Sequence, residues 1–314
     1  MGNTIYFVVP CYNEEEVLPE TSERLYEKMK SLVIAGKVSP DSRICFVDDG
    51  SKDKTWKMIE ELHEAEPVFV GVKLSRNRGH QNALLGGMMT VKDDCDALIS
   101  LDADLQDDPD AIDRMVDEWI AGADVVYGVR SARKTDTFFK RFTAEGFYKV
   151  MEIMGAQVVF NHADYRLLSR RAVEALAEYK EVNLFLRGMI PTLGYKTAVV
   201  TYERNERFAG ESKYPLKKML ALAWNGITSF STKPLSLIVT AGILLMVIAA
   251  ILLLVCAGRA IWGTAPSSVE VFSYSLWLLG GIQLLALGVV GEYIGKIYAE
   301  VKGRPRYIIE TYLK

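Results

Sequence analysis

The chain has 314 residues, 50% of them hydrophobic and 25% charged, with 40 acidic and 37 basic side chains. The formal net charge of −3 argues against a protein whose main partner is nucleic acid, and the charged fraction excludes a disordered or collagen-like chain. This length suits one large domain or two small ones, with a core that needs neither disulfides nor zinc.

Short apolar runs alternate with helical patterns over residues 1–200. The apolar runs predict strands at 5–9, 44–47, 68–74, 97–101 and 125–129. The helical patterns lie between them, at about 15–32, 55–65, 81–91 and 111–120. This alternation predicts an α/β domain with a mainly parallel sheet that helices cover on both faces.

Conspicuous polar residues follow four of these strands, and ligands collect at the carboxyl ends of such strands. The four groups are Tyr12-Asn13-Glu14, Asp48-Asp49-Gly50-Ser51, Ser75-Arg76-Asn77 and Asp102-Ala103-Asp104. Neither G-x-G-x-x-G nor G-x-x-x-x-G-K-[ST] is present, which excludes the usual dinucleotide and P-loop sites. The sequence therefore indicates a phosphate or nucleotide site built around carboxylates, and hence a metal.

The D-x-D sequence after the fourth strand is the sharpest chemical signal. In extended backbone, residues two apart point the same way, so Asp102, Asp104 and Gln106 are expected to present oxygens to one point. Mg²⁺ and Mn²⁺ prefer such ligands and commonly take one or two carboxylates plus substrate phosphates. The alternative is a solvated acidic turn, because three more aspartates follow. His63, His80 and His162 are too scattered to suggest zinc.

Two charge-free segments, 235–257 and 272–291, raise the mean hydropathy to +0.10. About 20 residues at ~1.5 Å each cross a ~30 Å hydrocarbon layer, so both segments predict membrane spans that form a helical hairpin. The alternative is a pair of buried core helices. Basic residues flank the pair, while the connecting loop has only Arg259. The positive-inside rule then places both termini and the preceding domain in the cytoplasm.

The segment 214–234 between domain and spans has apolar residues at helical spacing, with Lys217 and Lys218 beside them. It predicts an amphipathic helix that lies in the membrane interface, or else a helix packed on the domain itself. A basic stretch at 130–141 precedes an apolar helix; it either steers a lipid phosphate to the site or forms a solvated rim.

Four motifs in order resemble one known family: V-P-C-Y-N-E-E at 9–15, D-D-G-S-K-D-K-T at 48–55, D-A-D-L-Q-D-D-P at 102–109 and R-F-A-G-E-S-K-Y at 207–214. They resemble the polyprenyl-phosphate glycosyltransferases, which are family-two inverting enzymes with the GT-A fold. The resemblance covers nearly the whole chain and is closest to the bacterial bactoprenol glucosyltransferases. It implies a GT-A domain at 1–213, an interfacial region at 214–234, two spans within 235–294 and a cytoplasmic tail at 295–314.

The resemblance also implies site residues. Those expected to hold the nucleotide sugar are Pro10, Tyr12, Glu14, Val47, Asp49, Ala103 and Arg130. Asp102, Asp104 and Gln106 would hold Mg²⁺ or Mn²⁺, while Arg207, Ser212 and Lys213, together with Arg130, would face phosphates. Asp164 matches the position of the catalytic aspartate. Three residues have structural alternatives: Tyr12 as a packed strand-end aromatic, Asp49 as a turn former and Arg130 as an exposed cation.

The implied reaction moves a sugar from a nucleotide donor to a membrane polyprenyl phosphate, such as undecaprenyl phosphate, at the bacterial inner membrane. UDP-glucose is the donor that the resembled branch implies; N-acetylglucosamine, mannose from GDP-mannose and aminoarabinose stay open, as does a homo-oligomer. A phosphate monoester is largely a dianion at neutral pH, so Asp164 either removes a proton or only orients a substrate. A non-catalytic membrane scaffold is the rival from another class. A processive polysaccharide synthase is excluded because Q-x-x-R-W is absent.

Overall fold

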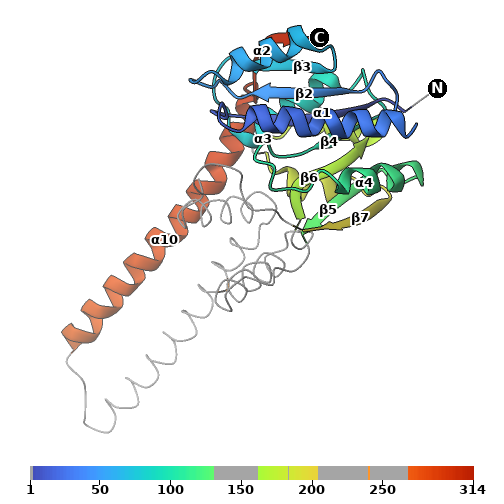
Figure 1. Ribbon diagram of the computed structural model, residues 1–314. Helices are drawn as coiled ribbons and strands as arrows, with labels where there is room; N and C mark the ends of the chain where they lie inside the picture. Colours follow the sequence, from blue (N-terminus) through green and yellow to red (C-terminus); the bar gives the residue numbers. More distant parts are fainter. Residues whose placement is uncertain (1–2, 131–161, 183, 204–239, 241–267) are drawn as a thin grey trace.

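A computed structural model describes residues 3–130, 162–182, 184–203, 240 and 268–314 (Figure 1). Within them, eight strands form one sheet in the order β7-β5-β6-β4-β1-β2-β3-β8. The strands are β1 (Ile5–Cys11), β2 (Arg43–Asp48), β3 (Phe69–Leu74), β4 (Ala97–Ser100), β5 (Val125–Arg130), β6 (His162–Ser169), β7 (Thr197–Tyr202) and β8 (Ile309–Leu313). The helices are α1 (Leu18–Ile34), α2 (Thr55–Ala65), α3 (His80–Val91), α4 (Ala111–Ile120), α6 (Arg170–Ala177), α7 (Leu186–Thr192) and α10 (Ser268–Lys302).

The predicted α/β architecture with a mainly parallel sheet is confirmed. β3, β2, β1 and β4 run parallel in that spatial order, and β5 pairs with β7 in parallel. Two strands interrupt the pattern: β6 lies antiparallel between β4 and β5, and β8 lies antiparallel beside β3. All five predicted strands and all four predicted helices are present, with ends shifted by up to three residues.

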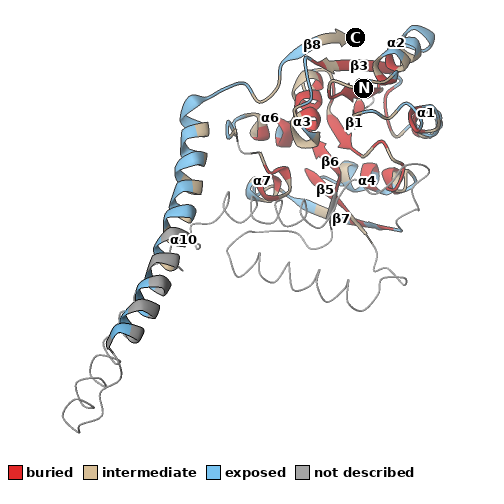
Figure 2. Ribbon diagram, turned by 90° about the vertical axis from the view of Figure 1, so that its left-hand side faces the viewer, coloured by how far each residue is buried: buried red, intermediate tan, exposed pale blue. Residues whose placement is uncertain are grey.

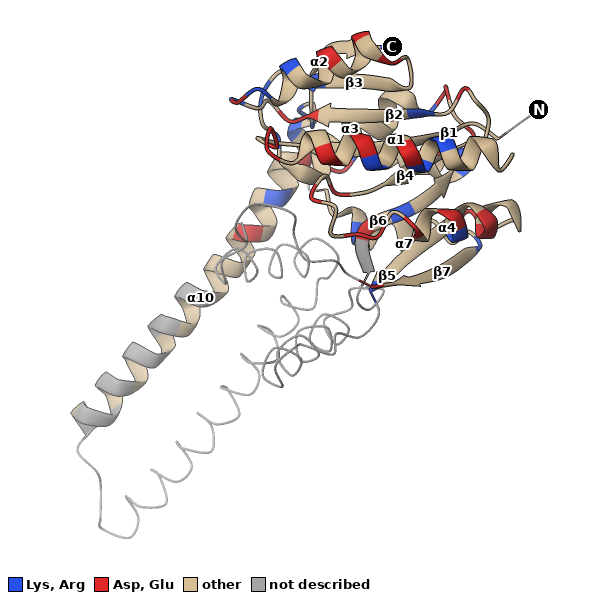
Figure 3. Cartoon of the chain, in the orientation of Figure 1, with Lys and Arg blue, Asp and Glu red and all other residues tan. Residues whose placement is uncertain are grey.

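Two apolar cores lie on opposite faces of the sheet (Figure 2). Because side chains alternate along a strand, Ile5 and Phe7 of β1 enter the core beneath α1, α2 and α4, whereas Tyr6 and Val8 enter the core beneath α3, α6 and α7. Both α1 and α4 carry charged residues (Figure 3). Lys28 of α1 forms ion pairs with Asp110, which directly precedes α4, at 2.6 Å and with Asp113 of α4 at 2.8 Å.

Helix α3 approaches the sheet unusually closely. A Cβ atom at Gly87 would lie 2.4 Å from Cγ2 of Val47 and 2.8 Å from Cγ1 of Val8. Only glycine leaves room for this approach. The first residues of α3 are thereby fixed beside the carboxyl ends of β2 and β4.

The end of the chain returns to the domain after the long helix α10, which extends away from it (Figure 1). Arg306 Nη1 donates to the backbone oxygen of Tyr179 at 3.0 Å, and β8 then pairs with β3. Lys73 of β3 also forms a 3.0 Å ion pair with Glu310 of β8. Residues 295–314 are predicted only as a tail, so this edge strand is not anticipated from the sequence.

Only one of the predicted membrane segments lies within the described residues. The span 235–257, apart from Thr240, and the interfacial segment 214–234 lie outside the described residues. The span 272–291 lies within α10. Among the residues that the structure describes, no helix meets the length and apolarity needed to cross a membrane.

Candidate active site

The loops that follow β1 and β2 are held together by side-chain hydrogen bonds. Asn13 adopts a left-handed backbone with φ of 53°, and its N–H donates to Oγ of Ser51 at 3.0 Å. Its Oδ1 accepts from the N–H of Lys52 at 2.9 Å, and the N–H of Glu14 donates to Oγ1 of Thr55 at 2.9 Å. Tyr12 directly follows β1 and is half-buried. Two predicted nucleotide-binding residues, Tyr12 and Glu14, thus lie on a rigid pair of loops.

Three more of the predicted nucleotide-binding residues are buried at these strand ends. Pro10 of β1 pairs with Val47 of β2, whose side chain packs under α3. Asp49 accepts hydrogen bonds from the N–H groups of Arg78 at 2.6 Å and Gly79 at 2.9 Å. Asp49 therefore fixes the loop before α3, whereas the local turn before Ser51 is closed by Asp48. Nucleotide contacts by these residues stay a prediction.

The D-x-D segment is a turn. Strand β4 ends at Ser100, Leu105 has a φ of 53°, and the N–H of Gln106 donates to Oδ1 of Asp104 at 3.2 Å. The expectation of extended backbone from Asp102 to Gln106 is therefore wrong, because the Asp104 side chain closes a local turn. The backbone oxygen of Ala103 accepts from Oγ1 of Thr21 at 2.7 Å, which fixes this turn to α1.

Asp102 lies among other carboxylates. Its side chain is 35% exposed, yet its Oδ1 is enclosed and accepts no hydrogen bond from the described part of the chain; His80 Nε2 lies 3.4 Å away. Burial, together with the charges of Asp107, Asp164 and Asp104, raises the pKa of Asp102 to about 6, although His80 opposes this rise. An enclosed carboxylate oxygen among like charges fits a divalent cation. No group of three His, Cys, Asp or Glu side chains in the described part of the chain is arranged to hold an ion alone.

Asp107 connects the D-x-D turn to the ends of two strands. Its Oδ1 accepts from the hydroxyl of Tyr202 in β7 at 2.5 Å and from Nη2 of Arg130 in β5 at 3.3 Å. Arg130 Nε also donates to the Tyr202 hydroxyl at 3.2 Å. Asp107 is buried, so the solvated acidic turn is wrong at this residue, and Arg130 is an ion-paired side chain rather than an exposed cation.

Asp164 is a buried carboxylate between two arginines. Its oxygens accept from Arg166 of β6 and from Arg187 of α7, the latter through Nε at 3.2 Å and Nη2 at 3.0 Å. Burial alone would raise the pKa of Asp164, but the charges of Arg187 and Arg166 hold it well below its usual range. His80 Nε2 lies 3.7 Å from Oδ2. Asp164 is therefore an ionised group with fixed orientation, and such a group is a poor proton acceptor at neutral pH.

Comparisons with known proteins assign the chain to a family. Residues 6–177 match the sequence profile described as "Glycosyl transferase family 2". The chain belongs to glycosyl transferase family 2. It is 48% identical to the uncharacterized glycosyltransferase YkoT of Bacillus subtilis, over 96% of this chain and 90% of that protein. It is 40% identical to the prophage bactoprenol glucosyl transferase homolog of Escherichia coli, over 99% of both chains.

A solved structure with a similar course of the chain is glucosyl-3-phosphoglycerate synthase from Mycobacterium tuberculosis. The TM-score is 0.46 at 18% identity, over 72% of this chain and 78% of that one.

The site of this family-two chain also includes residues that are not predicted from the sequence. His80 bridges Asp102 and Asp164, although the sequence shows it only as one of three scattered histidines. Its place at the start of α3, after the loop that follows the third strand, is a signal that could have identified it. Arg166 lies two residues from Asp164 on the same strand, a spacing that puts both on one face. Arg187 has no comparable local signal.

Other predicted site residues cannot be placed. Arg207, Ser212 and Lys213 lie outside the described residues, as does the basic stretch after Arg130. Arg130, which ends β5, and Tyr202, which ends β7, both contact Asp107.

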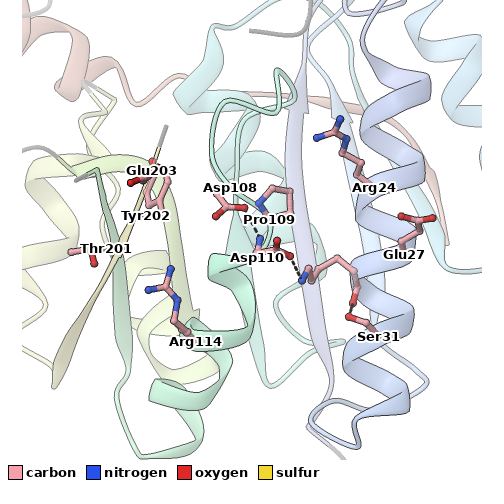
Figure 4. A pocket seen from close by; sticks show the side chains of 11 residues that line it. Arg24, Glu27, Ser31, Asp108, Pro109, Asp110, Arg114, Thr201, Tyr202 and Glu203 are labelled. Atoms are coloured by element: carbon pink, nitrogen blue, oxygen red, sulfur yellow. Dashed lines mark hydrogen bonds and ion pairs between the residues drawn. The ribbon is translucent and has the colours of Figure 1, made fainter. Parts of the chain in front are cut away.

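A groove of about 940 Å³ lies beside the site, between α1, the start of α4 and the end of β7 (Figure 4). Its walls carry both charge signs, for example Arg24 and Arg114 with Glu27 and Glu203. Tyr202 belongs to both the groove and the Asp107 contact. The mixed charge does not favour either an anionic or a cationic ligand.

Proposed function

We propose that this chain transfers glucose from UDP-glucose to the phosphate of a membrane polyprenyl phosphate such as undecaprenyl phosphate. The observation that carries the proposal is the 40% identity with the Escherichia coli bactoprenol glucosyl transferase homolog over 99% of both chains. The similarity therefore includes residues 178–314, which lie beyond the match to the family profile.

The donor is expected to bind across the carboxyl ends of β1, β2 and β4. Its base and ribose would contact the loops after β1 and β2, around Tyr12 and Asp49, and its diphosphate would face Asp102, Asp104 and Gln106 together with Mg²⁺ or Mn²⁺. The enclosed, unbonded Oδ1 of Asp102 supports this cation site. When bound, the ion would neutralise the charge that develops on the leaving diphosphate.

The transfer itself requires no strong base. An oxygen of the acceptor phosphate forms a bond to the anomeric carbon, the bond from that carbon to the diphosphate breaks, and UDP leaves with the electron pair. Because the acceptor is already an anion, no proton has to be removed. Asp164 is ionised and accepts hydrogen bonds from both Arg187 and Arg166. These bonds hold the two arginines in place, which supports a role of Asp164 in orientation.

We further propose that the chain is a multi-pass protein of the bacterial inner membrane. The segments 235–257 and 272–291 would form the hairpin, 214–234 would lie in the interface, and both termini would be cytoplasmic. The charge-free composition of the two segments and the basic residues around them support this topology.

A thermal-shift panel tests the donor. The full chain in detergent with Mn²⁺ is heated with UDP-glucose, UDP-N-acetylglucosamine, UDP-aminoarabinose or GDP-mannose, since a ligand specific for the native state raises its unfolding temperature. We expect UDP-glucose to give the largest rise. A larger rise with GDP-mannose would contradict the glucose assignment, and donor binding without UDP release when undecaprenyl phosphate is added would favour a non-catalytic scaffold.

A further inference from the structure

Two arginines share the Asp164 carboxylate, and they differ in exposure. Arg166 is 0% exposed and reaches Asp164 from within the sheet, whereas Arg187 is 33% exposed and reaches it from α7. Asp164 itself is 7% exposed. Arg166 thus contacts the carboxylate from the core, whereas part of the Arg187 guanidinium side chain is accessible to a ligand from solvent.

The described residues around Asp164 have a net positive formal charge, whereas those around Asp102 have a net negative one. Among the described residues, Asp164 with Arg166 and Arg187 carries one formal positive charge in excess. On the other side, the carboxylates of Asp102, Asp104 and Asp107 lie near one arginine of the described chain, Arg130. The imidazole of His80 lies between them, 3.4 Å from Asp102 and 3.7 Å from Asp164. The site therefore has an acidic side suited to a metal and a basic side suited to an anion.

Arg187 is held at this position by more than its ion pair. The N–H of Leu186, the residue before it, donates to Oε1 of Gln81 at 2.9 Å. Gln81 follows His80 at the start of α3, and the close packing of Gly87 fixes α3 on the sheet. The side chain of Arg187 is therefore pre-positioned, which lowers the entropy cost of binding a ligand.

We propose that Arg187 binds the phosphate monoester of the acceptor lipid, an inference that rests on the proposed function. A metal on the acidic side would compensate the donor diphosphate, so the second anion of the reaction needs a cation elsewhere. A guanidinium suits this task because its five N–H donors form a planar fork that fits a carboxylate and a phosphate together. Asp164 then acts as the positioning residue of Arg187.

The matched control is Arg171. It forms the same two-point ion pair with Asp124, whose side chain is also 7% exposed, at the opposite end of β6. The full chain is placed in phosphatidylcholine vesicles with undecaprenyl phosphate, UDP-glucose and Mn²⁺. KM for acceptor and donor is measured for wild type, Arg187→Gln, Arg187→Lys and Arg171→Gln, with inorganic phosphate as a competitor of the acceptor.

We expect Arg187→Gln to raise the acceptor KM about 10- to 100-fold, the range for a lost charged hydrogen bond, and to weaken competition by phosphate equally. The donor KM should stay within about twofold, and Arg187→Lys, which keeps the charge, should show a smaller rise. Arg171→Gln should change neither constant. The unchanged donor KM shows that each variant is folded; if Arg187→Gln does not fold, Arg187→Lys decides alone.

A donor KM that rises with the acceptor KM, or a lower kcat with both constants unchanged, would overturn the inference. In the first case Arg187 would serve the donor, and in the second it would only hold Asp164. Absence of glycolipid from the wild type with every donor would instead refute the proposed function, and the inference with it.

Discussion

Two Arg–Asp ion pairs lie at opposite ends of strand β6, and their surroundings differ. Asp124 and Asp164 are equally buried, and each accepts two hydrogen bonds from one arginine. Asp124 has Arg171, which is 62% exposed, and the hydroxyl of Ser169 at 3.0 Å, so its charge is balanced. Asp164 has a second, buried arginine and a histidine close by.

The same kind of ion pair serves two different purposes in this domain. At the amino-terminal ends of β4 and β5, the Asp124 pair fixes the start of α6, where Oγ of Ser169 also accepts from the N–H of Ala172. At the other end, the surplus of positive charge lies next to three carboxylates of the D-x-D turn. A balanced pair stabilises the fold, whereas an unbalanced one beside opposite charges is suited to bind a substrate.

Substitution of the two aspartates should separate these purposes most strongly. We expect Asp164→Asn to lower turnover about 100-fold or more, because Arg187 and Arg166 lose the anion that orients them, while donor binding stays normal. Asp124→Asn should keep turnover within about twofold. The measurements are glycolipid formation and a donor thermal shift on the same samples; near-wild-type turnover of Asp164→Asn would remove this residue from the site.

Substitution of Asp102, on the acidic side of the site, should have the next largest effect on activity. With Asp102→Asn, the Mn²⁺ concentration for half-maximal activity should rise by about tenfold or more, because a ligand charge is lost, and a chelator should abolish wild-type activity. Asp110, an exposed aspartate that pairs with Lys28, supplies the control. An identical metal titration for Asp102→Asn and Asp110→Asn would contradict a metal at Asp102.

The Asp124–Arg171 ion pair should affect the stability of the fold more than it affects activity. The hydrogen bonds from Arg171 lower the pKa of Asp124, so the pair stabilises the fold above the unfolded pKa of about 3.9 and loses this contribution as the pH falls through the lower folded value. Because Arg171 is largely exposed, we expect Asp124→Asn to cost roughly 1 kcal/mol. The difference in unfolding temperature from wild type should be constant from pH 6 to 8 and shrink below about pH 4. A difference that persists unchanged at pH 3 would show that charge pairing is not its cause.

The smallest effect concerns the support of Arg187. Gln81→Ala removes one neutral hydrogen bond to Leu186, so the acceptor KM should rise about two- to tenfold while the donor KM stays constant. Asn82→Ala is the control, since Asn82 donates to the backbone oxygen of Arg78 instead. Equal acceptor KM values for the two variants would show that the Gln81 bond does not position Arg187.

Much of the fold follows from the sequence because apolar spacing reports burial directly. The first five strands and the four helices between them are purely local patterns of this kind. Strand β6 is missed because it buries Asp164 and Arg166, and these two charged residues interrupt the apolar spacing that predicts a strand. Strand β8 is missed for a related reason, since its pairing with β3 joins residues more than 200 positions apart.

The candidate site is predictable in chemistry but only partly in geometry. Asp102 and Asp164 are predicted from motifs, and the structure brings both to His80. The motif does not show that Asp107 is buried against Tyr202, because this contact depends on β7, which comes much later in the chain. It also does not show that Asp104 closes a turn, because the same D-x-D spacing fits extended backbone. Arg187 lies in a short helix without a motif and is found only through its contact with Asp164.

Transfer of the sugar to a lipid phosphate is tested most directly by the stoichiometry of the reaction that the full chain catalyses in vesicles. UDP-glucose labelled in the sugar is supplied with undecaprenyl phosphate and Mn²⁺. The amounts of labelled lipid and of free UDP are then measured separately in the same reaction. We predict one UDP released for each labelled lipid and neither product in the presence of a chelator. Release of UDP without labelled lipid, or donor binding without any UDP release, would contradict transfer to a lipid phosphate.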